Sequence, residues 1–105
     1  MRENRDSNRG YAVERYAVYF LANRRRGTIY IGVTGNLPQR LGQHKALAVA
    51  GFTRRYRVTT LVYAEWFSEV SDAIAREKQL KGWNREWKIK LVEAANPDWR
   101  ELETW

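Results

Sequence analysis

Two polar side chains interrupt what should be the buried face of a helix early in the chain. Leu37, Arg40, Leu41 and His44 follow the i, i+3, i+4, i+7 spacing that places residues on one side of a helix. A guanidinium can hold a phosphate and stabilise the negative charge that builds up on it. An imidazole can move a proton near neutral pH. This pair therefore points to chemistry at a phosphate as well as to packing.

A carboxylate stands in an equivalent position further along the chain. Residues 70–80 have the pattern of an amphipathic helix, and Glu77 lies on its apolar stripe with Val70, Ala73, Ile74 and Leu80. Burying a carboxylate without a partner costs several kcal/mol or forces its protonation. We therefore expect Glu77 either to pair with an arginine or lysine or to bind a metal ion.

These side chains, together with tyrosine, fit the cleavage of a phosphodiester. A hard cation such as Mg²⁺ takes few protein ligands, so one carboxylate and several waters can hold it. An arginine and a proton-transferring tyrosine or histidine would complete a metal-assisted hydrolysis. With one histidine and no cysteine in the chain, a structural zinc site is not expected. The plainer interpretation of each residue alone is a buried ion pair or a core histidine.

The tyrosines belong to a predicted β-hairpin. Residues 16–22 and 28–33 are rich in aromatic and β-branched residues, and the turn between them contains Asn23 and Gly27. A four-residue loop would place Tyr19 directly opposite Tyr30, with both side chains on the same face of the sheet. The polar side chains converge on this pair if both helices pack at the same end of the hairpin.

The remaining elements follow in a simple order. Asn36 is expected to cap the first helix, with Gln39 three residues later, and Ser68 the helix that carries Glu77. We then expect a helix to about Lys45 or a little beyond, and a short helical end and a basic loop over 48–57. A strand over 58–67, a helix ending near Gly82 and a helix over 83–95 before Pro97 follow. The predicted order is β-β-α-β-α-α, an α+β fold (an α/β sandwich).

Size and charge indicate one basic domain. The chain has 105 residues, 19 Lys and Arg against 12 Asp and Glu, and a net charge of +7. We expect a flexible basic tail over residues 1–14 and a single domain with C-terminal helices over 15–105. A small basic domain most often meets nucleic acid, and less often an anionic membrane or an acidic protein. No apolar run has membrane-spanning length and no secretion signal opens the chain, so we expect a cytoplasmic protein without a membrane partner.

Four motifs in order resemble the GIY-YIG nuclease superfamily, and most closely its small stand-alone bacterial members. Tyr30-Ile31-Gly32 matches the second motif intact, whereas Ala17-Val18-Tyr19 keeps only the tyrosine of the first. The helix element at residues 39–44 and the stretch "REKQLKGW" at residues 76–83 also match. The resemblance extends from Tyr16 to the second C-terminal helix.

The resemblance implies a three-stranded antiparallel sheet flanked by helices and cleavage of DNA with one divalent metal ion, magnesium or manganese. Glu77 would be the metal ligand, Arg40 would contact the scissile phosphate, and Tyr19, Tyr30 and His44 would line the site. One departure concerns the general base: the DNA-repair branch has a lysine after this motif, where Val33 and Thr34 follow Gly32 here. Tyrosine titrates near pH ~10 and is a poor base unless that value falls, so the base remains open among Tyr19, Tyr30 and His44.

The expected function is a metal-dependent DNA endonuclease with little sequence specificity, acting on branched, nicked or damaged DNA. Phosphate contacts carry no sequence information, and the candidates for them are Arg24, Arg25, Arg26, Arg54, Arg55, Arg57, Lys78 and Lys81. One alternative is a catalytically weak nucleic-acid-binding module of the same fold, and another is a subunit whose basic face meets a partner protein. RNA as a ligand and a homodimer also stay open.

Overall fold

The computed structural model describes residues 14–46 and 51–103. The expected basic tail therefore lies outside the described residues, except for Glu14. Residues 47–50, where the first helix is expected to end, and the last two residues of the chain also lie outside them.

A three-stranded antiparallel sheet forms the centre of the fold, as expected. The strands are β1 (Tyr16–Ala22), β2 (Ile29–Thr34) and β3 (Thr60–Phe67), and their order across the sheet is β2-β1-β3. β1 is buried on both faces from Ala17 to Ala22, which is why its sequence is an almost continuous apolar run. β2 and β3 are the two edge strands.

The hairpin register differs from the prediction by two residues. Tyr19 pairs with Gly32 and Leu21 with Tyr30, so the expected Tyr19–Tyr30 pairing is wrong. The loop is longer than four residues because the Asn23 side chain accepts a hydrogen bond from the Thr28 amide at 2.9 Å and closes a wider turn. A shift of two residues keeps every side chain on its original face. Both tyrosines therefore still project from the same side of the sheet.

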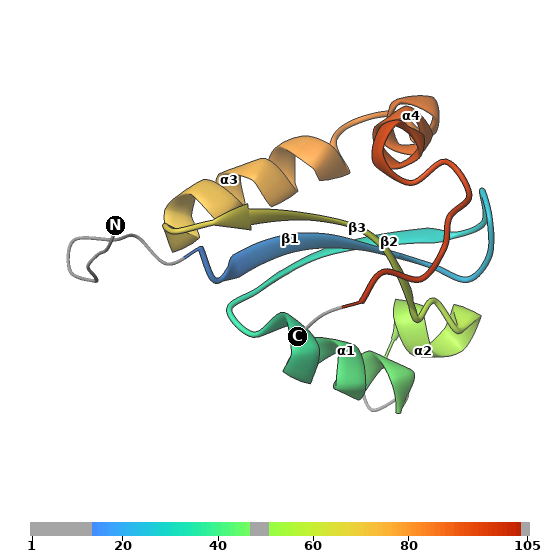
Figure 1. Ribbon diagram of the computed structural model, residues 1–105, viewed down its shortest axis with the longest axis horizontal. Coiled ribbons are helices and arrows are strands. Elements are labelled where there is room, and N and C mark those ends of the chain that lie inside the picture. The colour runs from blue at the N-terminus through green and yellow to red at the C-terminus, as the bar shows by residue number, and fades with distance from the viewer. Residues whose placement is uncertain (1–13, 47–50, 104–105) are drawn as a thin grey trace, which may run out of the picture.

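Helices cover the two faces of the sheet in separate layers (Figure 1). α3 (Val70–Lys81) and α4 (Arg85–Ala95) lie on one face, and α1 (Leu37–Lys45) and α2 (Phe52–Tyr56) lie on the other. The order β-β-α-β-α-α is confirmed, with the short helix α2 added where we expect a basic loop.

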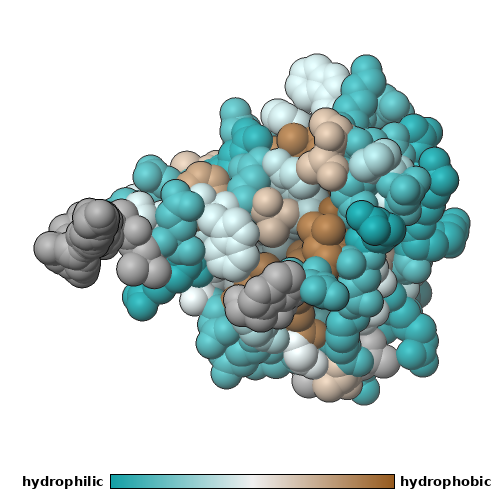
Figure 2. All heavy atoms as spheres, viewed as in Figure 1, coloured by the Kyte–Doolittle hydropathy of each residue, from teal (hydrophilic) through white to brown (hydrophobic). Residues whose placement is uncertain are grey.

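Each face of the sheet has its own apolar core. The residues of β1 alternate between the two cores, as the two-residue period of a strand requires. The core beneath α3 and α4 includes Val18, Phe20, Ala22, Ile31, Val62, Ala73, Leu80, Ile89 and Val92. The core beneath α1 includes Ala17, Tyr19, Leu21, Leu37, Leu41, Val58 and Leu61. Seen from the same side, hydrophilic residues dominate the periphery and hydrophobic residues appear toward the middle (Figure 2).

Helix caps confirm one expectation and correct another. The Asn36 side chain accepts a hydrogen bond from the Gln39 amide at 3.2 Å and caps α1. α3 begins one residue later than expected, so its N-cap is Glu69 rather than Ser68, without a side-chain cap bond. α4 begins at Arg85, two residues later than expected, and its N-cap Asn84 accepts a hydrogen bond from the Trp87 amide at 2.9 Å.

The C-terminal segment, residues 96–103, runs along the edge of β3 and joins the two layers. Asn96 donates to the carbonyl oxygen of Val62 at 3.0 Å, and the Leu102 amide donates to that of Leu61 at 2.8 Å. Trp99 packs in the core beneath α3 and α4, whereas Leu102 packs against the core beneath α1. None of the helices in residues 14–46 and 51–103 is both long and apolar enough to cross a membrane.

Candidate active site

Four of the expected site residues meet between the sheet and α1. Tyr19 comes from β1, Tyr30 from β2, and Arg40 and His44 from α1. The ring centroids of the two tyrosines are 6.2 Å apart, and the imidazole lies 5.9 Å from Tyr19 and 5.5 Å from Tyr30. We call these four residues the tyrosine–histidine cluster.

Tyr19 and His44 form the buried part of this cluster. Each is about 1% exposed, and a hydrogen bond of 3.1 Å joins the Tyr19 hydroxyl to His44 Nε2. On the other side of the ring, His44 Nδ1 lies 3.2 Å from the hydroxyl of Thr53 in α2. Tyr30 and Arg40 are only partly buried. They are therefore the members of the cluster that a substrate can reach first.

Gly32 is required beneath Tyr19. A Cβ atom at residue 32 would lie 2.6 Å from the Tyr19 hydroxyl oxygen and 2.7 Å from Cζ. Because the two residues pair across the strands, the phenol lies directly over the glycine on its way to His44. This close approach gives the glycine of the second motif a physical reason.

The protonation states in the cluster follow from burial and from Arg40. Burial raises the pKa of Tyr19 to about 12, although the nearby guanidinium of Arg40 opposes the shift. Burial lowers the pKa of His44 below its usual value, and the charge of Arg40 lowers it further. Tyr19 is thus a neutral phenol at neutral pH, and His44 is a neutral imidazole that can accept a proton.

Glu77 lies apart from the tyrosine–histidine cluster. It belongs to α3, on the opposite face of the sheet from α1 (Figure 1). Its side chain is 14% exposed, and its carboxylate forms an ion pair of 3.0 Å with Lys81 one turn later. The expected stripe is also wrong in part, because Val70 and Ile74 are 47% and 39% exposed.

The fit of a metal ion rests on the chemistry of this one carboxylate. Within residues 14–46 and 51–103, no three or more His, Cys, Asp or Glu side chains form a group that could hold a metal ion. A cation that keeps most of its water, such as Mg²⁺, needs only one or two carboxylates and the phosphate of its substrate. Glu77 fits that kind of binding, with Lys81 as the cation to be displaced. Its role as metal ligand stays a prediction.

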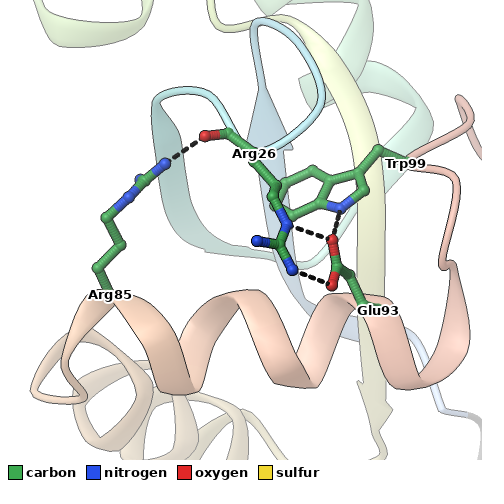
Figure 3. Close-up of polar contacts among 4 residues, drawn as sticks. All are labelled: Arg26, Arg85, Glu93 and Trp99. Carbon is green, nitrogen blue, oxygen red and sulfur yellow. Dashed lines mark hydrogen bonds and ion pairs between the residues drawn. The ribbon is translucent and has the colours of Figure 1, made fainter.

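The arginines of the hairpin turn differ from one another. Arg24 and Arg25 are exposed. Arg26 forms a two-pronged ion pair with Glu93 of α4, with both nitrogen–oxygen distances at 2.8 Å (Figure 3). Trp99 donates to the same carboxylate at 2.7 Å. Because its guanidinium already serves to hold α4 to the hairpin, Arg26 is the weakest phosphate-binding candidate in this turn.

α2 carries a second group of exposed cations. Arg54, Arg55 and Arg57 are exposed, and the Arg55 guanidinium lies 5.5 Å from the centre of the Tyr56 ring. An open pocket of about 740 Å³ is lined by Gly51, Arg54, Arg55 and Tyr56. On α3, Lys78 and Lys81 are exposed. Contact between these residues and phosphate stays a prediction.

Two structural contributions to the site are not predicted by the sequence patterns. Thr53 lies in a segment expected to be a basic loop, yet it is 2% exposed and contacts His44. Glu65 of β3 binds Arg76 of α3 through both oxygens, at 2.8 and 3.0 Å, and accepts from Tyr63 at 2.6 Å. This ion pair lowers the pKa of Glu65 and secures the helix that carries Glu77. The one sequence signal for this ion pair is the alternation of side chains along β3, which places the Glu65 carboxylate on the face of the sheet toward α3.

Comparisons with known proteins agree with this architecture. Residues 15–90 match the family model of the GIY-YIG catalytic domain. A UPF0213 protein of Staphylococcus haemolyticus is 38% identical over 66 residues, which cover 63% of this chain and 80% of that protein. A UPF0213 protein of Natronomonas pharaonis is 37% identical over 65 residues, 62% of this chain and 76% of that protein. No solved structure matches the chain with comparable significance. Since the family model spans most of the chain, this protein belongs to the GIY-YIG family, whose catalytic domain is of the nuclease type.

Proposed function

We propose that this protein is a metal-dependent DNA endonuclease with little sequence specificity, acting on branched, nicked or damaged DNA. The observation that carries the proposal is the tyrosine–histidine cluster, in which two phenols, a guanidinium and a neutral imidazole lie together on one face of the sheet. Tyr30 and Arg40 stay partly exposed beside the buried hydrogen bond of Tyr19 and His44, so a substrate can reach the cluster through them.

Arg40 is the group that would receive the scissile phosphate. Its guanidinium lies beside both phenols, hydrogen-bonds to Gln43 at 3.0 Å and is partly buried. On binding a phosphate it would stabilise the charge that develops during attack. Its movement onto the phosphate would also uncover the phenol oxygens that it now lies beside.

Proton transfer would end on His44. Tyr19 alone is a poor base because burial raises its pKa to about 12. The lowered pKa makes His44 a weaker base but keeps its ring unprotonated at neutral pH. Through its hydrogen bond to the Tyr19 hydroxyl, the phenol would take a proton from water while giving its own to Nε2. Tyr30, which is partly buried, would orient the attacking water. Each proton then has a defined donor and acceptor.

Glu77 would hold the divalent cation, magnesium or manganese, which would neutralise charge on the phosphate. β2 is an edge strand, with α1 on one face of the sheet and α3 on the other. The proposal therefore requires that DNA contact Tyr30 and Arg40 on one face of the sheet and Glu77 on the other. The exposed arginines of the hairpin turn and α2 would add contacts to the phosphates on either side.

The decisive experiment compares cleavage of plasmid, single-stranded, flap and junction DNA with and without Mg²⁺ or Mn²⁺. Glu77→Gln and Arg40→Ala should lower cleavage at least ~10²-fold, which is typical for the loss of one transition-state contact. Asp72→Asn is the matched control, because it neutralises an exposed carboxylate on the same helix and should leave cleavage unchanged. Cleavage that survives Glu77→Gln would reject the proposed metal ligand.

A nucleic-acid-binding module of the same fold is the second candidate. The ion pair between Glu77 and Lys81 favours it, because a carboxylate already paired with a cation has less need of a metal ion. Binding of every DNA form without cleavage under any metal condition would select this candidate. Affinity that falls steeply with salt would be common to both candidates, since phosphate contacts release counterions.

A further inference from the structure

Apart from Tyr19 and Trp99, three side chains with polar atoms are buried in the described part of the chain: His44, Thr53 and Asn96. Asn96 is explained by the backbone groups that it binds at the edge of β3. The other two contact each other. The buried hydroxyl of Thr53 in α2 has His44, a catalytic candidate, as its described side-chain partner. Buried polar groups in proteins are nearly always hydrogen-bonded. The partner of the Thr53 hydroxyl therefore needs an explanation.

Each nitrogen of the His44 ring has one oxygen partner. Nε2 lies 3.1 Å from the Tyr19 hydroxyl, and Nδ1 lies 3.2 Å from the Thr53 hydroxyl. A neutral imidazole has one N–H donor and one bare nitrogen, so the partner of one nitrogen decides the role of the other. To accept a proton from Tyr19, Nε2 must be bare and Nδ1 must carry the hydrogen.

We propose that Thr53 is the positioning residue of His44: its hydroxyl accepts the Nδ1 hydrogen and holds the ring so that Nε2 faces Tyr19. This inference rests on the proposed function, in which His44 receives the proton. Thr53 contacts neither substrate nor metal and acts only through the imidazole. The arrangement follows the general logic of a base oriented by a third group.

A role in packing alone does not account for the hydroxyl. α2 has five residues, and Arg54, Arg55 and Tyr56 are exposed while Thr53 is buried. So short a helix is not stable by itself and needs an anchor. A methyl group would anchor it as well and would bury no polar atom, so the hydroxyl indicates a further function at this position.

Two of the phosphate-binding candidates are neighbours of Thr53 in the sequence. Arg54 and Arg55 follow it directly and line the open pocket beside α2.

The test uses the fact that the chain contains one histidine, so its ring signals need no assignment. Long-range ¹H–¹⁵N spectra of the imidazole report which nitrogen carries the hydrogen. We expect the Nδ1–H form in the unchanged protein and in Thr53→Ser, which keeps the hydroxyl. Thr53→Val, which replaces the hydroxyl by a methyl group, should shift the ring toward the Nε2–H form. Thr53→Cys, a weak hydrogen-bonding partner, replaces it if the valine variant does not fold.

Cleavage supplies the second measurement. Thr53→Val should lower kcat by about 10- to 100-fold with KM nearly unchanged, because a misplaced catalytic group costs rate rather than binding. Thr53→Ser should retain most of the activity. An Nε2–H ring in the unchanged protein, an unshifted tautomer in Thr53→Val, or equal losses in serine and valine variants would each overturn the proposal. If no DNA is cleaved but the tautomer shifts, the proposed function fails and the positioning of His44 by Thr53 stands.

Discussion

Replacing Gly32 by alanine should disrupt the site and destabilise the fold, whereas the same change at Gly42 should not. The new Cβ at residue 32 would lie 2.6 Å from the Tyr19 hydroxyl oxygen, and ordinary contacts begin at 3.4 Å, so one group must move by about 0.8 Å. Tyr19 is 1% exposed, held by close packing and by its 3.1 Å bond to His44. Forcing extra volume into a packed core costs about 1–3 kcal/mol.

The measurement is thermal or urea unfolding of the two alanine variants beside the unchanged protein. For a domain of this size, each kcal/mol lost lowers the melting temperature by about 4–8 °C. Gly42 lies within α1 with nothing within 4 Å of its would-be Cβ, so Gly42→Ala should stabilise by ~0.5–1 kcal/mol through helix propensity. A neutral or stabilising Gly32→Ala would show that Tyr19 does not lie over the glycine, and the proposed geometry of the cluster would fail with it.

Three further predictions concern pH and the C-terminal segment. The ring signals of His44 should titrate with a midpoint below pH 6.5. Because the pKa of His44 is lowered in the folded state, the contribution of the neutral ring to stability should be lost as the pH falls below 6.5. A midpoint above pH 6.5 would contradict a buried neutral ring. The ion pair with Arg26 lowers the pKa of Glu93 from 4.5 to about 2, so the melting temperature should fall as the pH is lowered from 4.5 to about 2. Glu93→Gln should flatten that part of the profile of melting temperature against pH. An unchanged profile would exclude the ion pair in solution. Asn96→Ala removes three side-chain hydrogen bonds and should cost on the order of 3 kcal/mol in urea unfolding, at ~1 kcal/mol for each bond, whereas a loss near zero would indicate that the segment is not held to β3.

The strands were predictable because their patterns are strong. Residues 16–22 form a long apolar, β-branched and aromatic run that is typical of a central strand, and β1 has those bounds. The register of the hairpin was not predictable from the same pattern. A slip of two residues leaves each side chain on its face, so only the turn, with the Asn23 side chain and the left-handed backbone of Arg26, decides it.

The position of Glu77 shows a different limit. Helical spacing correctly indicates that its side chain is largely shielded, but spacing cannot tell which face of a sheet the helix will cover. The same spacing groups Val70 and Ile74 with Ala73 and Leu80, although only the latter two are buried. Four of the five predicted catalytic residues could be placed together from the sequence, since Tyr19, Tyr30, Arg40 and His44 belong to consecutive elements. The contact of Thr53 with His44 could not be predicted, because it depends on α2 folding back onto α1.

The C-terminal segment leaves the sheet with two unlike edges. Residues 96–103 occupy part of the edge of β3, whereas β2, within the described part of the chain, pairs only with β1. An unpaired edge can recruit a strand from another copy and begin aggregation. Arg24 and Arg25 in the turn before β2, together with a net charge of +7, would keep copies apart by electrostatic repulsion. Concentrated salt would then screen this repulsion and weaken the protection against self-association.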